Sequence, residues 1–138
     1  MFLDTSVIVK LLIREDDSAH YLGLVKGQEA VICDLAVTEV LSALTARERA
    51  GFLAAELRAA AWENYSKRIR LGYYKVLPVS TTAFRKAEQF ILRCHPQVAL
   101  RAADALHLAA CDLEQAFPLV TNDKVMIAAA KHLGIPVL

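Results

Sequence analysis

Residues 1–6 read Met-Phe-Leu-Asp-Thr-Ser, and residues 118–123 read Pro-Leu-Val-Thr-Asn-Asp. In each stretch a short apolar cluster runs directly into polar residues and then into a segment of helix-forming composition. This pattern is typical of a buried strand that ends at the edge of a parallel sheet and leads into a helix. Ligands bind beyond the carboxyl ends of strands in open α/β sheets, so candidate functional residues are expected at that edge.

The rest of the chain continues the alternation. Apolar clusters of strand length occupy residues 1–3, 30–33, 75–79, 118–120 and 136–138. The intervening stretches predict helices over residues 5–13, 17–26, 35–50, 53–71, 81–94, 99–115 and 122–133. Gly51 suits the end of the third helix, and Gly134 suits a left-handed cap before Pro136. We therefore expect one domain over residues 1–138, a three-layer α/β/α fold whose central parallel sheet has about five short strands and seven helices around it.

Composition narrows the class of protein. The chain has 138 residues, 56% of them hydrophobic, which is enough to build a core without disulfides or structural metal. Its net charge of +1 excludes a strongly basic coat for nucleic acid, so any contact with a polyanion must be local. Three widely spaced cysteines, without a C-x-x-C pair, indicate a reducing compartment. With no signal peptide and no membrane-spanning segment in the sequence, we expect a cytoplasmic, soluble protein.

Two acids follow the quoted clusters. Asp4 ends the first cluster and is either a site residue or the cap of the next helix. In the last cluster, Thr121 or Asn122 is a candidate cap, and Asp123 would interact favourably with the N-terminal dipole of that helix. Capping explains one polar residue there better than three in a row.

Two further acids lie inside predicted helices. Glu39 has Leu35, Ala36, Ser42 and Ala43 one turn away, and Asp104 is surrounded by alanines and leucines. An acid on such a face is costly to bury without a partner. Arg101 and His107 are candidate partners of Asp104, one turn to either side. Asp104, His107 and Cys111 also share a helical face, which is a weak indication of a soft-metal site.

Four stretches, taken together, resemble the PIN-domain nucleases, and in particular the VapC-type toxins of prokaryotic toxin–antitoxin pairs. They are Phe2–Val7, Leu35–Val40, Leu100–Ala109 and Val120–Lys124. Each is weak alone, but their order and spacing match over essentially the whole chain.

The resemblance implies an acidic cluster of Asp4, Glu39, Asp104 and Asp123 that binds metal and catalyses cleavage. It also implies supporting roles for Thr5, Ser6, Thr121 and Asn122. Hard carboxylate oxygens suit Mg²⁺, with Mn²⁺ as a substitute, and clustered acids repel each other without a cation. The implied activity is Mg²⁺-dependent hydrolysis of RNA phosphodiester bonds by a homodimer that a VapB-type antitoxin binds.

Basic residues are candidates for contacts to RNA. Lys10, Arg14, Arg101 and Lys124 lie near the acidic motifs and are candidates for phosphate contacts, with ordinary surface charges as the alternative for most of them. In the helix predicted near residues 54–70, we expect three residues to pack inward: Leu57, Ala61 and Tyr65. The same helix carries four basic residues that we expect to be solvated: Arg58, Lys67, Arg68 and Arg70. Contact with RNA and a dimer surface are the alternatives for this basic face.

Other classes fit less well. A haloacid-dehalogenase-type phosphatase needs a second aspartate two residues after the nucleophile, where this chain has Ser6. A P-loop NTPase is excluded because no G-x-x-x-x-G-K-[ST] stretch occurs. The remaining alternative is a nuclease-like fold used as a non-catalytic RNA- or protein-binding module.

Overall fold

The computed structural model describes all 138 residues and contains seven helices and one four-stranded sheet. The strands are β1 (Phe2–Leu3), β2 (Ala30–Cys33), β3 (Tyr74–Leu77) and β4 (Leu119–Val120). The helices are α1 (Thr5–Leu12), α2 (Ser18–Val25), α3 (Asp34–Arg49), α4 (Ala55–Arg70), α5 (Thr81–Cys94), α6 (Ala102–Leu113) and α7 (Lys124–Leu133). All seven predicted helices are therefore confirmed, with ends that differ from the expected ones by up to three residues.

The sheet has the order β3-β2-β1-β4, and all neighbouring strands are parallel. Phe2 aligns with Val31 on one side and with Leu119 on the other, so the first strand lies in the interior of the sheet. The two shortest strands, β1 and β4, are fully buried, as expected for strands covered on two faces.

The expected fifth strand at residues 136–138 is wrong. This segment forms only an isolated bridge between Leu119 and Val137. Pro136 has no N–H group to donate to a ladder, although its carbonyl accepts from the Leu119 amide at 2.9 Å. The third strand also ends earlier than predicted, at Leu77, because Pro78 follows it.

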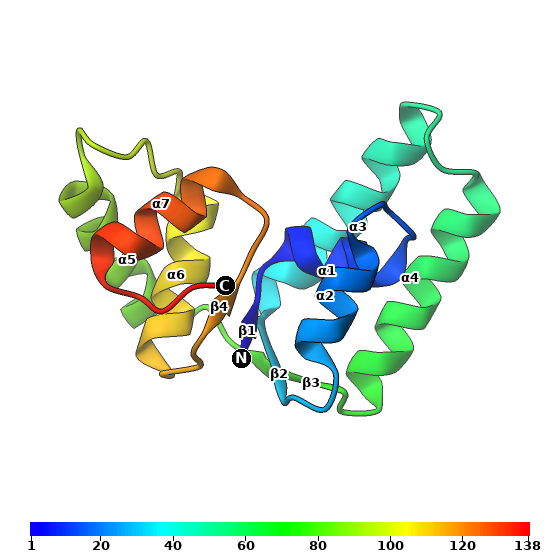
Figure 1. Cartoon of the computed structure of the whole chain (residues 1–138), viewed down its shortest axis with the longest axis horizontal. Coiled ribbons are helices and arrows are strands. Elements are labelled where there is room, and N and C mark those ends of the chain that lie inside the picture. Colours follow the sequence, from blue (N-terminus) through cyan, green and yellow to red (C-terminus); the bar gives the residue numbers. More distant parts are fainter.

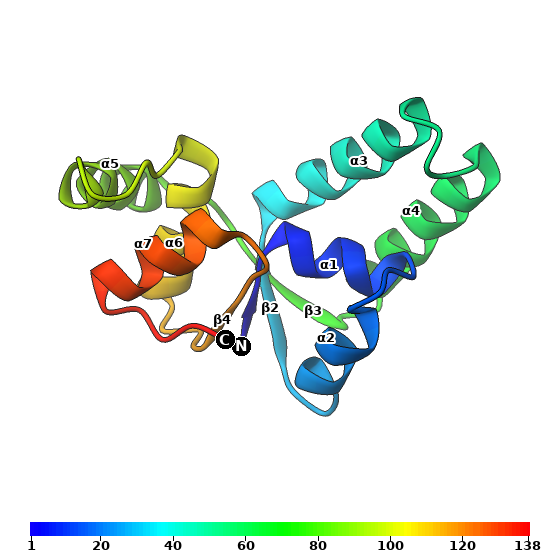
Figure 2. The same ribbon diagram turned by 45° about the horizontal axis from the view of Figure 1, so that its top comes forward.

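Helices cover both faces of the sheet, which confirms the three-layer arrangement. In two views, α5, α6 and α7 lie on one side of the strands and α1 to α4 on the other (Figures 1 and 2). The core joins both layers through the sheet residues Phe2, Leu3, Ile32, Leu119 and Val120. The N- and C-termini lie side by side, because the last segment runs next to β4.

Two details of the helices differ from expectation. Leu57 is 61% exposed and does not pack inward, whereas Ala61 and Tyr65 are buried. Asp123, rather than Thr121 or Asn122, is the N-cap of α7. Gly134 does form the expected left-handed C-cap, with φ of 77°. No helix is both long and apolar enough to span a bilayer.

Candidate active site

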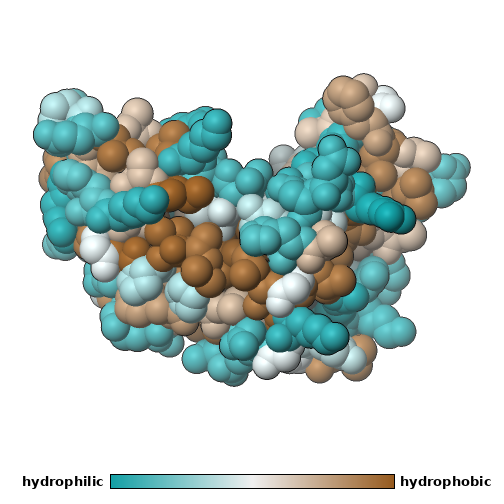
Figure 3. Space-filling view, in the orientation of Figure 1, coloured by the Kyte–Doolittle hydropathy of each residue, from teal (hydrophilic) through white to brown (hydrophobic).

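An open cleft lies at the carboxyl edge of the sheet, where α1, α3, α6 and the start of α7 meet. Its volume is about 610 Å³. All four candidate acids line it: Asp4, Glu39, Asp104 and Asp123. The space-filling view shows the molecule hollowed between its two groups of helices (Figure 3). The topology thus brings together residues up to 119 positions apart, because β1 and β4 are neighbours in the sheet.

Asp4 combines the two roles that the sequence left open. It is the N-cap of α1, with Oδ2 accepting from the Ser6 amide at 3.3 Å. The same Oδ2 accepts from the Ser6 hydroxyl at 2.6 Å and the Thr121 hydroxyl at 2.9 Å. Although Asp4 is only 6% exposed, Oδ1 has no protein donor. Hydrogen bonds to one oxygen thus hold the carboxylate and leave the other free.

Thr121 and Asn122 connect the end of β4 to the start of the chain. The Thr121 hydroxyl accepts from the Asp123 amide at 3.0 Å while donating to Asp4. The Asn122 amide N–H donates to the Ser6 hydroxyl at 3.1 Å, and its side-chain oxygen accepts from Tyr21 at 3.1 Å. Asp123 itself caps α7 through Oδ1, which accepts from two backbone amides at 2.7 and 2.9 Å. Its Oδ2 has no protein donor.

Glu39 is held by two donors from different elements. Its Oε2 accepts from the Thr5 hydroxyl at 2.6 Å and from His107 Nε2 at 2.7 Å. Burial alone would raise the pKa of Glu39, but the hydrogen bonds to His107 and Thr5 outweigh burial and lower it. For His107 the directions are reversed: burial alone would lower its pKa, but its contacts with Cys33 and Glu39 raise the pKa to about 10. Glu39 is therefore a carboxylate at neutral pH.

Asp104 differs from the other three acids because no protein group donates a hydrogen bond to it. Burial raises the pKa of Asp104 above its ordinary value, and the nearby carboxylates of Asp123 and Asp4 raise it further. Arg101 lowers this pKa only through its charge, without forming an ion pair. The expected pairing of His107 with Asp104 is wrong, since the imidazole contacts Glu39 and Cys33 instead.

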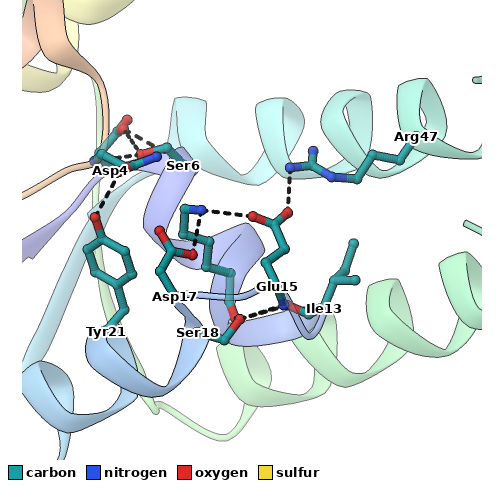
Figure 4. A network of polar contacts seen from close by, with 10 residues as sticks. Asp4, Ser6, Ile13, Glu15, Asp17, Ser18, Tyr21 and Arg47 are labelled. Carbon is teal, nitrogen blue, oxygen red and sulfur yellow. Dashed lines mark hydrogen bonds and ion pairs between the residues drawn. The ribbon is translucent and has the colours of Figure 1, made fainter. Parts of the chain in front are cut away.

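Cations and a fifth acid line the side of the cleft formed by α1 and α3. The carboxylate of Glu15 bridges Lys10 and Arg47, at 2.8 Å from each, and Lys10 also pairs with Asp17 at 2.7 Å. Arg47 extends from α3 to Glu15 in Figure 4. Since two carboxylates neutralise Lys10 and its side chain is 11% exposed, it is a poor candidate for contacting RNA phosphate. Neither Glu15 nor Arg47 is predictable from the sequence, because helical spacing does not relate a residue in a loop to a residue on α3.

The carboxylate oxygens that line the cleft suit a hard cation. Asp4, Glu39 and Asp123 each leave one oxygen without a protein donor, and Asp104 leaves both. As the side chains stand, no three His, Cys, Asp or Glu residues are close enough to hold one metal ion together. The soft-metal arrangement of Asp104, His107 and Cys111 is also not found. The residues therefore fit an ion that takes one or two carboxylates and completes its shell with water, as Mg²⁺ usually does.

The three-layer α/β/α fold and the acidic cleft at the carboxyl edge of the parallel sheet place this protein among the α/β proteins whose site lies beyond the carboxyl ends of the strands. The chain belongs to the PIN domain family, which residues 1–136 match. No curated protein matches it in sequence.

Solved structures of similar fold include toxin–antitoxin proteins. VapC20 of Mycobacterium tuberculosis, a sarcin–ricin loop cleaving toxin, has 20% identity and a TM-score of 0.71 over 93% of both chains. VapBC2 of Rickettsia felis, bound to a promoter DNA fragment, has 14% identity and a TM-score of 0.69, covering 99% of this chain and 96% of that one. A toxin–antitoxin complex from Klebsiella pneumoniae has 14% identity and a TM-score of 0.65, covering 99% and 94%.

Proposed function

We propose that this protein is a Mg²⁺-dependent endoribonuclease, the toxin of a VapBC-type toxin–antitoxin pair. The observation that carries this proposal is Asp104, a carboxylate without any protein donor in a cleft that it shares with three other acids. A binding module has no use for this repulsion, whereas a metal-dependent nuclease needs it to attract cations. Membership of the PIN domain family and the fold shared with a loop-cleaving toxin support the same activity.

Each acid has a separate part in the proposed reaction. Asp4 and Asp104 are the principal ligands of the ion. Each has a carboxylate oxygen without a protein hydrogen-bond donor, and the two carboxylates are close enough for the charge of Asp4 to raise the pKa of Asp104. Glu39 orients the attacking water or accepts its proton, and Asp123 orients water or supports a second ion. Bound here, Mg²⁺ or Mn²⁺ would supply Lewis acidity for phosphodiester hydrolysis. Ser6 and Thr121 hold the Asp4 carboxylate in one rotamer, as groups that support metal ligands do.

RNA in a single-stranded or looped form is the proposed substrate. Its splayed backbone enters an open groove more easily than a stiff duplex does. Arg101 and Lys124 stand at the starts of α6 and α7, are exposed, and have no ion-pair partner. They are therefore better placed than Lys10 to contact phosphates close to Asp104 and Asp123.

The test is cleavage of a looped RNA with Mg²⁺ or with chelator, using wild type, Asp104→Asn and Asp112→Asn. Asp112 lies on the same helix but pairs with Lys86, so its variant controls for loss of a charge from α6. Wild type and Asp112→Asn should cleave with Mg²⁺ and leave 5′-phosphate and 3′-hydroxyl ends, while Asp104→Asn should be inactive. Products with 2′,3′-cyclic phosphate ends would contradict a water nucleophile. RNA binding without cleavage would favour the non-catalytic alternative.

We also propose that the protein forms a homodimer and binds a VapB-type antitoxin. Several large apolar side chains are more than half exposed, among them Phe52, Leu57, Phe84 and Leu92. A basic antitoxin side chain, most suitably arginine, would pair with the cleft carboxylates. Sedimentation of the purified protein and co-purification with the product of an adjacent reading frame test this. A strict monomer without any co-purifying partner contradicts it.

A further inference from the structure

His107 is the one imidazole that is fully buried, and its ring joins the two helical layers. It belongs to α6 and is 1% exposed. Nε2 lies 2.7 Å from Glu39 Oε2 on α3, and Nδ1 lies 3.3 Å from Cys33 Sγ at the end of β2. The ring packs against Phe2 in a T-shaped arrangement, with centroids 6.1 Å apart. Both ring nitrogens therefore have defined partners.

In the hydrogen bond between His107 and Glu39, only His107 can be the donor. A carboxylate can only accept, so Nε2 carries the proton whether the ring is neutral or cationic. The Thr5 hydroxyl donates to the same oxygen at 2.6 Å. Oε2 thus has two donors, one from α1 and one from α6, while Oε1 has none. Glu39 is the only one of the four cleft acids that another helix's side chain holds through a charge-assisted bond of this kind.

This arrangement restricts a side chain that is otherwise flexible. A glutamate has three rotatable side-chain bonds, and a glutamate side chain without hydrogen-bond partners would sample many positions across the cleft. Two donors on one oxygen select a single rotamer, and Cys33 on Nδ1 keeps the ring from turning over. The orientation of Oε1 is then set before any ligand enters.

We infer that His107 is a positioning residue, which together with Thr5 holds Glu39 so that Oε1 is presented to the reacting water and ion. This inference rests on the proposed nuclease activity, in which Glu39 orients or deprotonates that water. The competing reading is that His107 only fills space beside Phe2. Groups that support metal ligands or catalytic acids in this way typically contribute 10- to 100-fold to activity.

Two amide substitutions separate these readings. In His107→Gln the side-chain nitrogen takes roughly the place of Nε2, and in His107→Asn it takes the place of Nδ1. Both remove the ring and its charge, so they disturb packing and electrostatics alike. With a looped RNA and Mg²⁺, we expect His107→Gln to retain kcat within about 3-fold, and His107→Asn to lose about 10- to 100-fold, the range typical of such supporting groups. KM for RNA should change little in either, because Glu39 acts on water rather than on the backbone. Equal losses in the two variants would overturn the inference.

A second pair covers the case in which the His107 variants do not fold. Thr5→Ser keeps the hydroxyl that donates to Oε2, and Thr5→Val replaces it with a methyl group of similar size. Thr5→Ser should cleave like wild type, and Thr5→Val should lose kcat. Equal activity of the two would overturn the two-donor arrangement.

A measurement that needs no cleavage keeps this inference distinct from the proposed function. In ¹⁵N-histidine-labelled protein, the Nε2 proton of His107 should give a slowly exchanging resonance, because the ring is buried and the proton is bonded. That resonance should move in Glu39→Gln and stay in place in Glu88→Gln, an exposed control. An unmoved resonance overturns the inference even if wild type cleaves RNA. A moved resonance in a protein that cleaves nothing overturns only the nuclease proposal.

Discussion

The hydroxyl of Thr121 donates to the carboxylate of Asp4 at 2.9 Å, across 117 residues of sequence. The same hydroxyl accepts from the Asp123 amide at 3.0 Å. One buried side-chain oxygen therefore connects the acid that follows the first strand to the acid that follows the last one, and changes at Thr121 should affect both.

We predict that Thr121→Val lowers cleavage by about 10- to 100-fold, as loss of a group that holds a metal ligand does. It should also destabilise the fold by about 1–3 kcal/mol, because the Asp123 amide loses its acceptor in a partly buried position. Thr121→Ser retains the hydroxyl and should keep most of both. Cleavage rates and urea denaturation of the two variants check this; equal behaviour would exclude a role for the hydroxyl.

Asp104→Asn should stabilise the metal-free protein at neutral pH, while it abolishes cleavage. The pKa of Asp104 is raised in the folded chain, so the carboxylate penalises folding above that pKa. The penalty disappears as the pH falls below the ordinary value of 3.8, where the group is protonated in both states. The gain should be at most about 1 kcal/mol, because solvent screens a partly exposed charge.

Thermal melting in chelator at pH 7 and at pH 3.5 measures this effect. The advantage of Asp104→Asn over wild type should be present at pH 7 and mostly lost at pH 3.5. Mg²⁺ should raise the Tm of wild type by mass action and raise that of Asp104→Asn less. Asp112→Asn loses its pairing with Lys86 and should not be stabilised. An Asp104→Asn protein that melts below wild type in chelator would identify Asp104 as a structural residue.

Glu15→Gln should weaken the fold by about 1 kcal/mol at pH 7, the upper range for a partly exposed ion pair. Burial alone would raise the pKa of Glu15, but its bonds to Lys10 and Arg47 lower it. Its contribution is therefore present above the ordinary value of 4.5 and is lost as the pH falls through the lowered pKa. Glu63→Gln, which breaks the exposed pair with Arg70, should cost nothing measurable. Denaturation of both variants at pH 7 and pH 3 gives the comparison.

Arg101→Gln and Lys124→Gln should each raise KM for RNA several-fold and leave kcat nearly unchanged. Each loss of a phosphate contact should also reduce the slope of log KM against log salt concentration by about 0.7, the value per contact for single strands. Arg85→Gln, on α5 and paired with Glu88, is the control and should alter neither quantity. Unchanged salt slopes would show that the two residues are ordinary surface charges.

Tyr65→Phe should leave stability unchanged or increase it by up to about 1 kcal/mol. The Tyr65 hydroxyl is fully buried and has no hydrogen-bond partner, so its removal relieves an uncompensated desolvation cost. The midpoint of urea denaturation should rise or stay constant without a change in slope. A clear loss of stability would reveal a partner for the hydroxyl, such as a buried water.

Much of the architecture followed from patterns along the chain, while contacts across it did not. The helices and four of the strands were predictable because apolar clusters alternate with helix-forming stretches. The fifth strand failed because a terminal Pro-Val-Leu segment is apolar enough for a strand but lacks a donor at Pro136. Helical spacing placed Leu57 inward, yet its side chain is 61% exposed in the fold.

In the site too, the four acids were predictable from the sequence, while the contacts between elements were not. The resemblance to a nuclease family indicated the four acids, and the sheet order places all of them around one cleft. Helical spacing offered Asp104 as the partner of His107, because it relates residues only within one helix. The observed partner, Glu39, lies 68 residues away on another helix, where tertiary packing alone brings it into contact.

The interior position of β1 has a consequence during synthesis of the chain. Its neighbour β4 is translated after the other three strands, and Asp104 and Asp123 follow Asp4 by 100 and 119 residues. A growing polypeptide therefore carries the first half of the cleft without the second. A nascent chain on the ribosome therefore lacks the assembled cleft until Asp123 has been added and β4 has paired with β1.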